Sequence, residues 1–513
     1  MLAALFLLTA LYPAVPAAAQ NPGQGPAPNI LLIQADDLGY GDLGAYGQSR
    51  FHTPVLDRMA REGTRFTQYY AGSPVCAPSR AVLMTGLHTG HAWIRGNGDT
   101  PLRPEDTTVA EVLQKAGYRT AMIGKWGLGP PGSTGAPERQ GFEHSFGFLD
   151  HTHAHRQYTD HLWRNGKRIA TDPREYANDL FTQETAAFIE KADRRPFFVY
   201  LNYTVPHAEL RAPEEAMAAF RGKYPEEPFT NAEADGRAGG PDDVSLGYRS
   251  QPTPRAAFAA MITRMDRDIG TLLKLLEKRG LDRKTIVLFS SDNGPHEAGG
   301  GDPVFFKSSG GLRGAKGSLY EGGIRVPMIA RWPGTIPAGR VSDHVWAHWD
   351  IMPTLAELAG AAPPANIDGV STSRALRGLP QATQPFLYWE FFGRGFQQAV
   401  RTGPWKALRL SPGGDLELYN LQIDPAEQRN VASAHPDVVK RVEDYLATAR
   451  TESPLWPMPT FWETWARRIV KTGLPLLALA GIIVVAVVCF RKITPRLQRS
   501  HPRATASAPD SGR

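Results

Sequence analysis

The chain alternates short, wholly apolar runs with longer segments in which apolar residues recur every three or four positions. The short runs have the length of buried strands, and helices with one apolar face are predicted between them. The predicted strands are Asn29–Ala35, Thr120–Ile123, Phe197–Tyr203, Thr285–Ser290 and Met328–Arg331, and the predicted helices are Thr108–Ala116, Tyr176–Lys191 and Ala256–Lys278. This alternation predicts an α/β domain whose mainly parallel sheet is covered by helices on both faces.

The pattern changes after about residue 380, where shorter runs are separated by turn residues. Gln397–Leu410 and Asp415–Leu421 are predicted as short strands joined at a Pro-Gly-Gly turn, and His435–Thr451 as one amphipathic helix. We therefore expect a large domain over residues 20–380 and a small C-terminal subdomain, an antiparallel sheet with a helix, over 381–452. The proline-containing stretch 453–472 is predicted as a linker.

Two further apolar runs lie outside these domains. Residues 1–19 end in three alanines, the small-residue pattern of a signal-peptide cleavage site. Gly473–Phe490 has no charged residue and approaches the ~20 residues that cross a bilayer as a helix. Residues 491–513 contain six basic residues and one acidic residue, which predicts a cytoplasmic tail. The sequence thus predicts an exported protein, held by one transmembrane helix with its body on the periplasmic or extracellular side.

Charge and cysteine content narrow the function classes. The formal net charge is +6, and the predicted tail supplies +5 of it, so the rest of the chain is nearly neutral and no nucleic-acid partner is indicated. The sequence has two cysteines, and Cys489 lies inside the predicted membrane segment, so no disulfide framework is expected. The remaining cysteine, Cys76, is either a small buried apolar side chain or a reactive thiol.

The residues after Cys76 favour the reactive alternative. The segment Cys76–Gly86 reads C-A-P-S-R-A-V-L-M-T-G, and Ser79 and Arg80 begin a predicted helix. Cys76 therefore precedes a helix N-terminus, where backbone N–H groups and the helix dipole favour anions. A purely structural thiol gains nothing from a position before a helix N-terminus. The position of Cys76 therefore indicates a nucleophile.

Two predicted strands end in oxygen-bearing side chains. Asp36 and Asp37 follow the first strand, and Asp292 and Asn293 follow the run T-I-V-L-F-S. Each pair alone is compatible with a helix cap or a turn. In one parallel sheet, however, the carboxyl ends of strands form a shared edge where ligands bind. Three carboxylates and a carboxamide suit Ca²⁺ or Mg²⁺ better than zinc, so a metal site is predicted here.

The motif C-x-P-S-R-x-x-x-x-T-G at Cys76 resembles the signature of the type I sulfatase family, in its arylsulfatase-like bacterial branch. The resemblance extends over about residues 29–450 and implies an alkaline-phosphatase-like α/β fold. In that family a maturation enzyme converts the cysteine to formylglycine, and the hydrated aldehyde attacks sulfur. Carried over, Cys76 is the nucleophile precursor and Arg80 supports its hydrate. The metal, usually calcium in this family, would be bound by Asp36, Asp37, Asp292 and Asn293.

Three further residues match the family pattern. Lys125 and Lys316 lie among glycines and resemble the lysines that bind the sulfate oxygens and the ester oxygen. His207, in N-Y-T-V-P-H, matches the histidine placed near the leaving oxygen as a proton donor. Without this resemblance, each would be read as an ordinary solvated lysine or an ordinary surface or core histidine.

The chain departs from the family at Gly127. The surrounding sequence is G-K-W-G-L-G, whereas the family commonly has G-K-W-H-L-G, with a histidine that helps to expel sulfate. A replacement base is expected from His153 or His155, in the histidine-rich segment 151–155, or from His296 after the predicted metal ligands. We favour the segment, although it is also compatible with a transition-metal patch or a solvated surface.

Together these features predict a sulfuric ester hydrolase acting on a sulfated carbohydrate or a small aryl sulfate, with saccharides preferred. One alternative is a phosphodiester or phosphonate ester hydrolase of the same superfamily, since its members share the metal site. The other, suggested by Gly127, is a membrane-tethered binding protein that has lost turnover.

Overall fold

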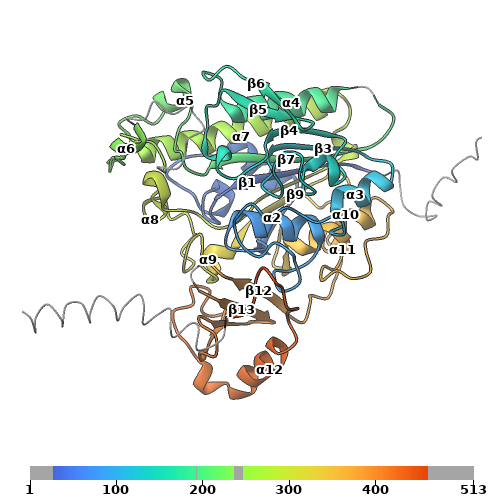
Figure 1. The fold of residues 1–513 in the computed structure, drawn as a ribbon, viewed down its shortest axis with the longest axis vertical. Coiled ribbons are helices and arrows are strands. Elements are labelled where there is room, and N and C mark those ends of the chain that lie inside the picture. The colour runs from blue at the N-terminus through green and yellow to red at the C-terminus, as the bar shows by residue number, and fades with distance from the viewer. Residues whose placement is uncertain (1–26, 192, 236–246, 394, 460–513) are drawn as a thin grey trace, which may run out of the picture. The chain divides into compact units, whose positions relative to one another are not determined.

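The computed structural model describes residues 27–191, 193–235, 247–393 and 395–459 (Figure 1). Of these, residues 27–410 and 414–457 belong to one compact unit. The predicted signal peptide (1–19), membrane segment (473–490) and tail (491–513) lie outside the described residues. The domain boundaries proposed from the sequence stay predictions.

The prediction of a membrane-spanning fold requires correction. No helix within the described ranges is both long and apolar enough to cross a bilayer. The 25-residue helix α7 (Pro254–Lys278) has the length, but its sequence interleaves apolar residues with charged ones such as Asp266 and Arg267. The fold class is therefore corrected to a mixed α/β fold with a C-terminal antiparallel sheet. The membrane-anchored location, which depended on the same helix, is withdrawn with it.

A mixed sheet of eleven strands forms the centre of the described fold. Its strands are β1 (Asn29–Asp36), β2 (Thr64–Tyr70), β3 (Arg119–Lys125), β4 (His144–Phe148), β5 (His161–Arg164), β6 (Lys167–Ala170), β7 (Phe197–Pro206), β8 (Thr285–Ser291), β9 (Arg325–Arg331), β10 (Arg340–Ser342) and β11 (Trp346–Ala347). Their order is β10-β2-β9-β8-β1-β7-β3-β4-β5-β6, with β11 also paired to β2. All five strands predicted from the sequence are confirmed.

The central strands β8, β1, β7, β3 and β4 are parallel, as predicted, whereas both flanks contain antiparallel pairs. Strand β9, which follows the four-residue helix α9 (Glu321–Ile324), runs antiparallel to β8. Strand β2 is absent from the sequence prediction because T-R-F-T-Q-Y-Y has few apolar residues and is only partly buried.

Side chains of β1 alternate between two hydrophobic cores, since successive residues of a strand face opposite sides. Leu31 and Ile33 pack with α1 (Pro54–Glu62), α4 (Ala177–Glu190) and α7. Ile30 and Leu32 pack with α2 (Cys76–Thr85), α3 (Val109–Lys115) and α10 (Ile351–Leu358) on the other face (Figure 1). The three predicted helices are thus confirmed as α3, α4 and α7. Shorter helices are α5 (Glu214–Ala218), α6 (Ala232–Asp235), α8 (Pro303–Phe306) and α11 (Ser373–Leu376).

The C-terminal part contains the predicted antiparallel sheet and helix. Strands β12 (Leu387–Phe391), β13 (Gln397–Thr402), β14 (Trp405–Arg409) and β15 (Leu416–Asn420) pair in chain order, and α12 (Pro436–Leu446) packs on them. The predicted run Gln397–Leu410 is two strands, because Gly403 and Pro404 form a tight turn between paired Thr402 and Trp405. Trp389 of β12 packs against Tyr70 and Trp349, which joins this sheet to the α/β core.

Candidate functional site

Parallel neighbours β1 and β8 place the four predicted metal ligands at one edge of the sheet. Asp36, Asp37, Asp292 and Asn293 are all fully buried. The backbone N–H of Asp37 donates to Oδ1 of Asp292 at 3.0 Å, and Nδ2 of Asn293 donates to Oδ1 of Asp37 at 2.7 Å. The structure therefore brings together the two pairs that are separated by about half of the chain.

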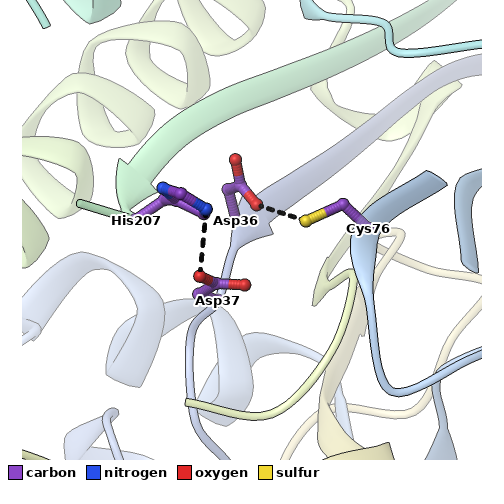
Figure 2. Close-up of side chains that lie close together, drawn as sticks. All are labelled: Asp36, Asp37, Cys76 and His207. Atoms are coloured by element: carbon purple, nitrogen blue, oxygen red, sulfur yellow. Dashed lines mark hydrogen bonds and ion pairs between the residues drawn. The ribbon is translucent and has the colours of Figure 1, made fainter. Parts of the chain in front are cut away.

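The donor set of this cluster fits a divalent cation. Oδ1 of Asn293 is buried and has no hydrogen-bond partner in the described part of the chain. Asp36, Asp37, Cys76 and His207 each offer a ligand atom, and these atoms lie within 4.8 Å of one another (Figure 2). A buried, unsatisfied acceptor beside carboxylates is the environment that a hard cation satisfies.

Cys76 is the first residue of α2 and is preceded by extended Val75. Its Sγ lies 3.6 Å from Oδ1 of Asp36, as Figure 2 shows. Burial raises the pKa of the thiol to about 12, although Lys125 and Lys316 act in the opposite direction. The unmodified side chain consequently carries its proton at neutral pH and is a weak nucleophile.

Arg80 joins the start of α2 to both strand ends. It lies one helical turn after Cys76, on the same face of the helix. Its Nη2 is 2.8 Å from Oδ2 of Asp292 and 3.8 Å from Oδ1 of Asp36, and its Nη1 donates to the carbonyl oxygen of Lys125 at 2.8 Å. This fully buried guanidinium fixes the position of α2 relative to the carboxylates.

Two lysines neutralise the first carboxylate pair. Nζ of Lys125, at the end of β3, lies 2.6 Å from Oδ2 of Asp36, and Nζ of Lys316 lies 2.8 Å from Oδ2 of Asp37. Burial acts to raise the pKa of Asp36, but the nearby cations, Lys125 foremost, hold it well below its usual range. Burial and the charge of Asp36 raise the pKa of Asp292 to about 7.

His207 follows the last residue of β7, and its ring is almost fully buried. Its Nε2 lies 3.4 Å from Oδ2 of Asp37 (Figure 2). Its Nδ1 contacts the carbonyl oxygen of Ala208. The ring of His155 stacks on it at 4.6 Å between centroids, and that of His296 at 5.5 Å. Burial first, and then the charge of Lys316, lowers the pKa of His207 well below its usual value.

The three histidines proposed to replace the one absent at Gly127 have different surroundings. His155 and His296 lie beside His207, but both ring nitrogens of His296 are engaged, by the carbonyl of Pro206 and the N–H of Ala298. His153 packs between Phe148 and His161, and its Nε2 is bonded to Oγ1 of Thr159 at 2.8 Å. Of the three, His155 and His296 border the site, and His153 packs in the connection between β4 and β5.

His151 is a further histidine at the site, and the sequence pattern did not distinguish it from its neighbours in the segment 151–155. A Cβ atom added at Gly127 would lie 2.4 Å from Cε1 of His151, so this imidazole occupies the space of the missing side chain. The signal in the sequence was its place in the histidine-rich segment, the nearest histidines along the chain after Gly127 apart from His144.

A cleft of about 920 Å³ adjoins the site. Its wall includes Lys316 and His296 together with Lys307 and Ser309. This wall offers cations and hydroxyl groups to a polar, anionic ligand.

The chain matches the family profile described as "Sulfatase" over residues 28–361, and residues 315–452 match "N-sulphoglucosamine sulphohydrolase, C-terminal". It is 33% identical to human (Homo sapiens) arylsulfatase A over 487 residues, covering 81% of this chain and 86% of that protein. Identity to N-acetylgalactosamine-6-sulfatase of Canis lupus familiaris is 31% over 444 residues, covering 79% and 76%.

The solved structure of Ps i-CgsB in complex with k-i-k-neocarrahexaose has a TM-score of 0.72 and 27% identity to this chain, covering 87% of this chain and 98% of that one. The two family matches together span residues 28–452, which include the α/β core and the C-terminal sheet. The chain therefore belongs to the sulfatase family and is a sulfuric ester hydrolase.

Proposed function

We propose that Cys76, after conversion to formylglycine, is the nucleophile that cleaves a sulfate ester in this site. The observation that carries the proposal is the position of Cys76, with Sγ 3.6 Å from Asp36 in a buried cluster of carboxylates and cations. A host maturation enzyme would perform the conversion. Because Cys76 is only 2% exposed, it would have to act before the chain has folded.

The neighbouring residues have separate roles in the proposed reaction. The hydrated aldehyde at position 76 attacks sulfur, and the ester oxygen leaves. Lys125 and Lys316 balance the negative charge that develops on the sulfate and ester oxygens. His207 protonates the leaving oxygen. Since its Nδ1 faces the carbonyl of Ala208, donation from Nε2 requires the imidazolium form, which the negative charge of a bound ester favours.

The cation is proposed to be Ca²⁺, with Mg²⁺ as the alternative. Asp36, Asp37, Asp292 and Asn293 would bind it, and the unsatisfied Oδ1 of Asn293 supports this assignment. When bound, it would polarise a sulfate oxygen and draw negative charge away from sulfur.

We propose a sulfated carbohydrate as the substrate class. The cleft beside Lys316 is lined by Lys307 and Ser309, which can bind the anionic and hydroxyl groups of a saccharide. The similarity to an N-acetylgalactosamine-6-sulfatase and to Ps i-CgsB in its neocarrahexaose complex supports the same class.

The test is to produce the protein with a formylglycine-generating enzyme and to measure both the residue at position 76 and the turnover of sulfated saccharides and 4-nitrophenyl sulfate. Peptide mass spectrometry is expected to find the aldehyde or its hydrate. Cys76→Ala should reduce kcat at least ~10³-fold, because the covalent step is lost.

Cys489→Ala changes the other cysteine of the chain and should leave turnover unchanged. A phosphate diester serves as the control substrate. Equal activity of Cys76→Ala and the unmutated protein would refute formylglycine catalysis.

A further inference from the structure

We propose that His151 supplies the imidazole that releases sulfate from the covalent intermediate, taking the space that Gly127 leaves open. This assignment rests on the formylglycine reaction proposed above. It assigns the role to a member of the segment 151–155 other than His153 and His155.

The backbone brings His151 beside Gly127. The N–H of Trp126 donates to the carbonyl of Phe148 at 2.9 Å, and that of Gly127 donates to Leu149 at 3.1 Å, so pairing continues beyond the ends of β3 and β4. A Cβ atom at position 127 would lie 2.8 Å from Nε2 and 2.9 Å from Nδ1 of His151. A side chain at 127 and the ring of His151 therefore exclude each other.

His151 as a whole is partly exposed, but its two ring nitrogens are buried and unpaired in the described part of the chain. Nδ1 and Nε2 are both inaccessible to solvent, and neither has a hydrogen-bond partner within the described ranges. Leaving a buried polar atom unpaired destabilises a fold, so an apolar side chain would serve the fold better. His153 and His296, by contrast, have bonded ring nitrogens. The unpaired ring indicates a ligand that is bound only during the reaction.

His151 also lies within the electrostatic field of the site. Burial is the main cause that lowers its pKa well below 6.5, and the charges of Lys125 and Arg80 add to the effect. Lys125 ends the strand that Gly127 follows, and Arg80 shares a helix face with Cys76. The ring is therefore neutral and retains a lone pair that can accept a proton, and a bound sulfate favours its protonation.

The proposed step conserves atoms and electrons. In the sulfated formylglycine hydrate, the second hydroxyl gives its proton to a ring nitrogen of His151. The electron pair of that O–H bond forms the C=O bond, and the bond between carbon and the sulfate oxygen breaks. Sulfate leaves with the electron pair of the broken carbon–oxygen bond. The imidazolium then loses its proton to solvent, and water hydrates the aldehyde again.

The test uses the full chain, with formylglycine and metal contents measured in each variant, in rapid-mixing experiments with 4-nitrophenyl sulfate. His151→Ala should release about one equivalent of nitrophenol per formylglycine in a burst, since the first step is intact. Steady-state turnover should then be at least ~10²-fold slower than in the unmutated enzyme. Added imidazole should accelerate the slow phase, because the space beside Gly127 admits a small base.

His144→Ala is the matched control. His144 begins β4 in the same part of the fold and forms a partly exposed pair with Glu184 at 2.8 Å, so its variant should show normal turnover and no burst. His151→Asn keeps a polar side chain but has no basic nitrogen, so it should behave as His151→Ala does. Agreement between the two variants would show that the slow turnover is not caused by misfolding of one of them.

Unchanged kcat in folded His151→Ala or His151→Asn would overturn the assignment of His151 alone, and so would a slow reaction without a burst. If the unmutated protein contains formylglycine and hydrolyses no sulfate ester, the proposed function fails and the assignment fails with it.

Discussion

At the scale of single residues, the site consists of buried charges that depend on one another. Asp36 has no solvent exposure and lies against Lys125 at 2.6 Å and Arg80 at 3.8 Å. Removing one partner would leave a buried charge uncompensated, which costs more than the pair contributes. Changes at these positions therefore affect folding as well as catalysis, and each needs a measurement of stability beside that of activity.

His88, outside the site, gives a pH-dependent prediction. Burial lowers its pKa to about 4, with Asp368 opposing and His91 and Arg95 reinforcing the effect. The folded-state pKa is below the ~6.5 of an unfolded histidine, so on acidification the unfolded chain takes up the proton first. The stability due to the neutral ring is present above pH ~6.5 and is lost as the pH falls toward ~4.

His88→Asn keeps an acceptor for the N–H of Gly90 and removes the titration. Between pH 7 and pH 4, the unmutated protein should lose up to about 3 kcal/mol of unfolding free energy relative to this variant. Urea unfolding at several pH values measures the difference. Parallel stability profiles of the two proteins would contradict the prediction.

At the scale of elements, strand ends deliver the functional groups. Strands β1, β3, β7 and β8 are neighbours in the parallel part of the sheet, and each carries or precedes one of Asp36, Lys125, His207 and Asp292. Helix α2 completes the arrangement by placing Cys76 at its N-terminus. Helices that support this edge therefore contribute to the geometry of the site without touching it.

Helix α3 gives a test at this scale. Its N-cap Thr108 accepts from the N–H of Glu111 at 3.2 Å, Glu111 accepts from the N–H of Thr108 at 2.7 Å, and the Thr108 hydroxyl donates to Gln140 at 2.8 Å. Thr108→Ala should lower the unfolding free energy by ~1–2 kcal/mol, because the cap and this bond are lost. Thr108→Ser keeps the hydroxyl and should remain within ~0.5 kcal/mol of the unmutated protein. Urea titrations that show equal losses for both variants would exclude capping as the cause.

At the scale of the whole molecule, a buried ionic cluster joins the α/β core to the C-terminal sheet. Nζ of Lys406 in β14 lies 2.9 Å from Glu321 and 2.9 Å from Glu427, and neither Lys406 nor Glu321 is exposed. Tyr70 of β2 also donates to Glu321 at 2.8 Å. Glu321 begins the helix that leads into β9, so the C-terminal sheet supports the loop that carries Lys316.

Lys406→Met should destabilise the protein by about 3–5 kcal/mol, because Glu427 loses its buried counter-charge and Glu321 is left with its pair with Arg325 at 3.2 Å. Lys440→Met removes an exposed pair with Asp444 at 3.0 Å and should change stability by less than ~1 kcal/mol. Denaturant unfolding of the two variants measures the contrast. A Lys406→Met protein as stable as Lys440→Met would show that the cluster does not hold the two parts together.

The sequence by itself determined the central strands, the long helices and the family. These signals are local: apolar runs identify buried strands, a three-to-four repeat identifies helices, and the motif at Cys76 is contiguous. It also indicated that Asp36, Asp37, Asp292 and Asn293 share one edge, because parallel strands align their carboxyl ends. Their roles stay predictions, as do those of Lys125, His207 and Lys316.

Only the tertiary structure decided features that depend on distant contacts. The antiparallel direction of β9 and the place of β2 beside it are established only by the pairing of the strands. The register between β3 and β4 places His151 in the space beside Gly127, whereas His153 turns toward Phe148 and His161. The sequence shows that position 127 has no side chain. Which neighbouring side chain fills that space depends on how the fold packs distant segments against each other.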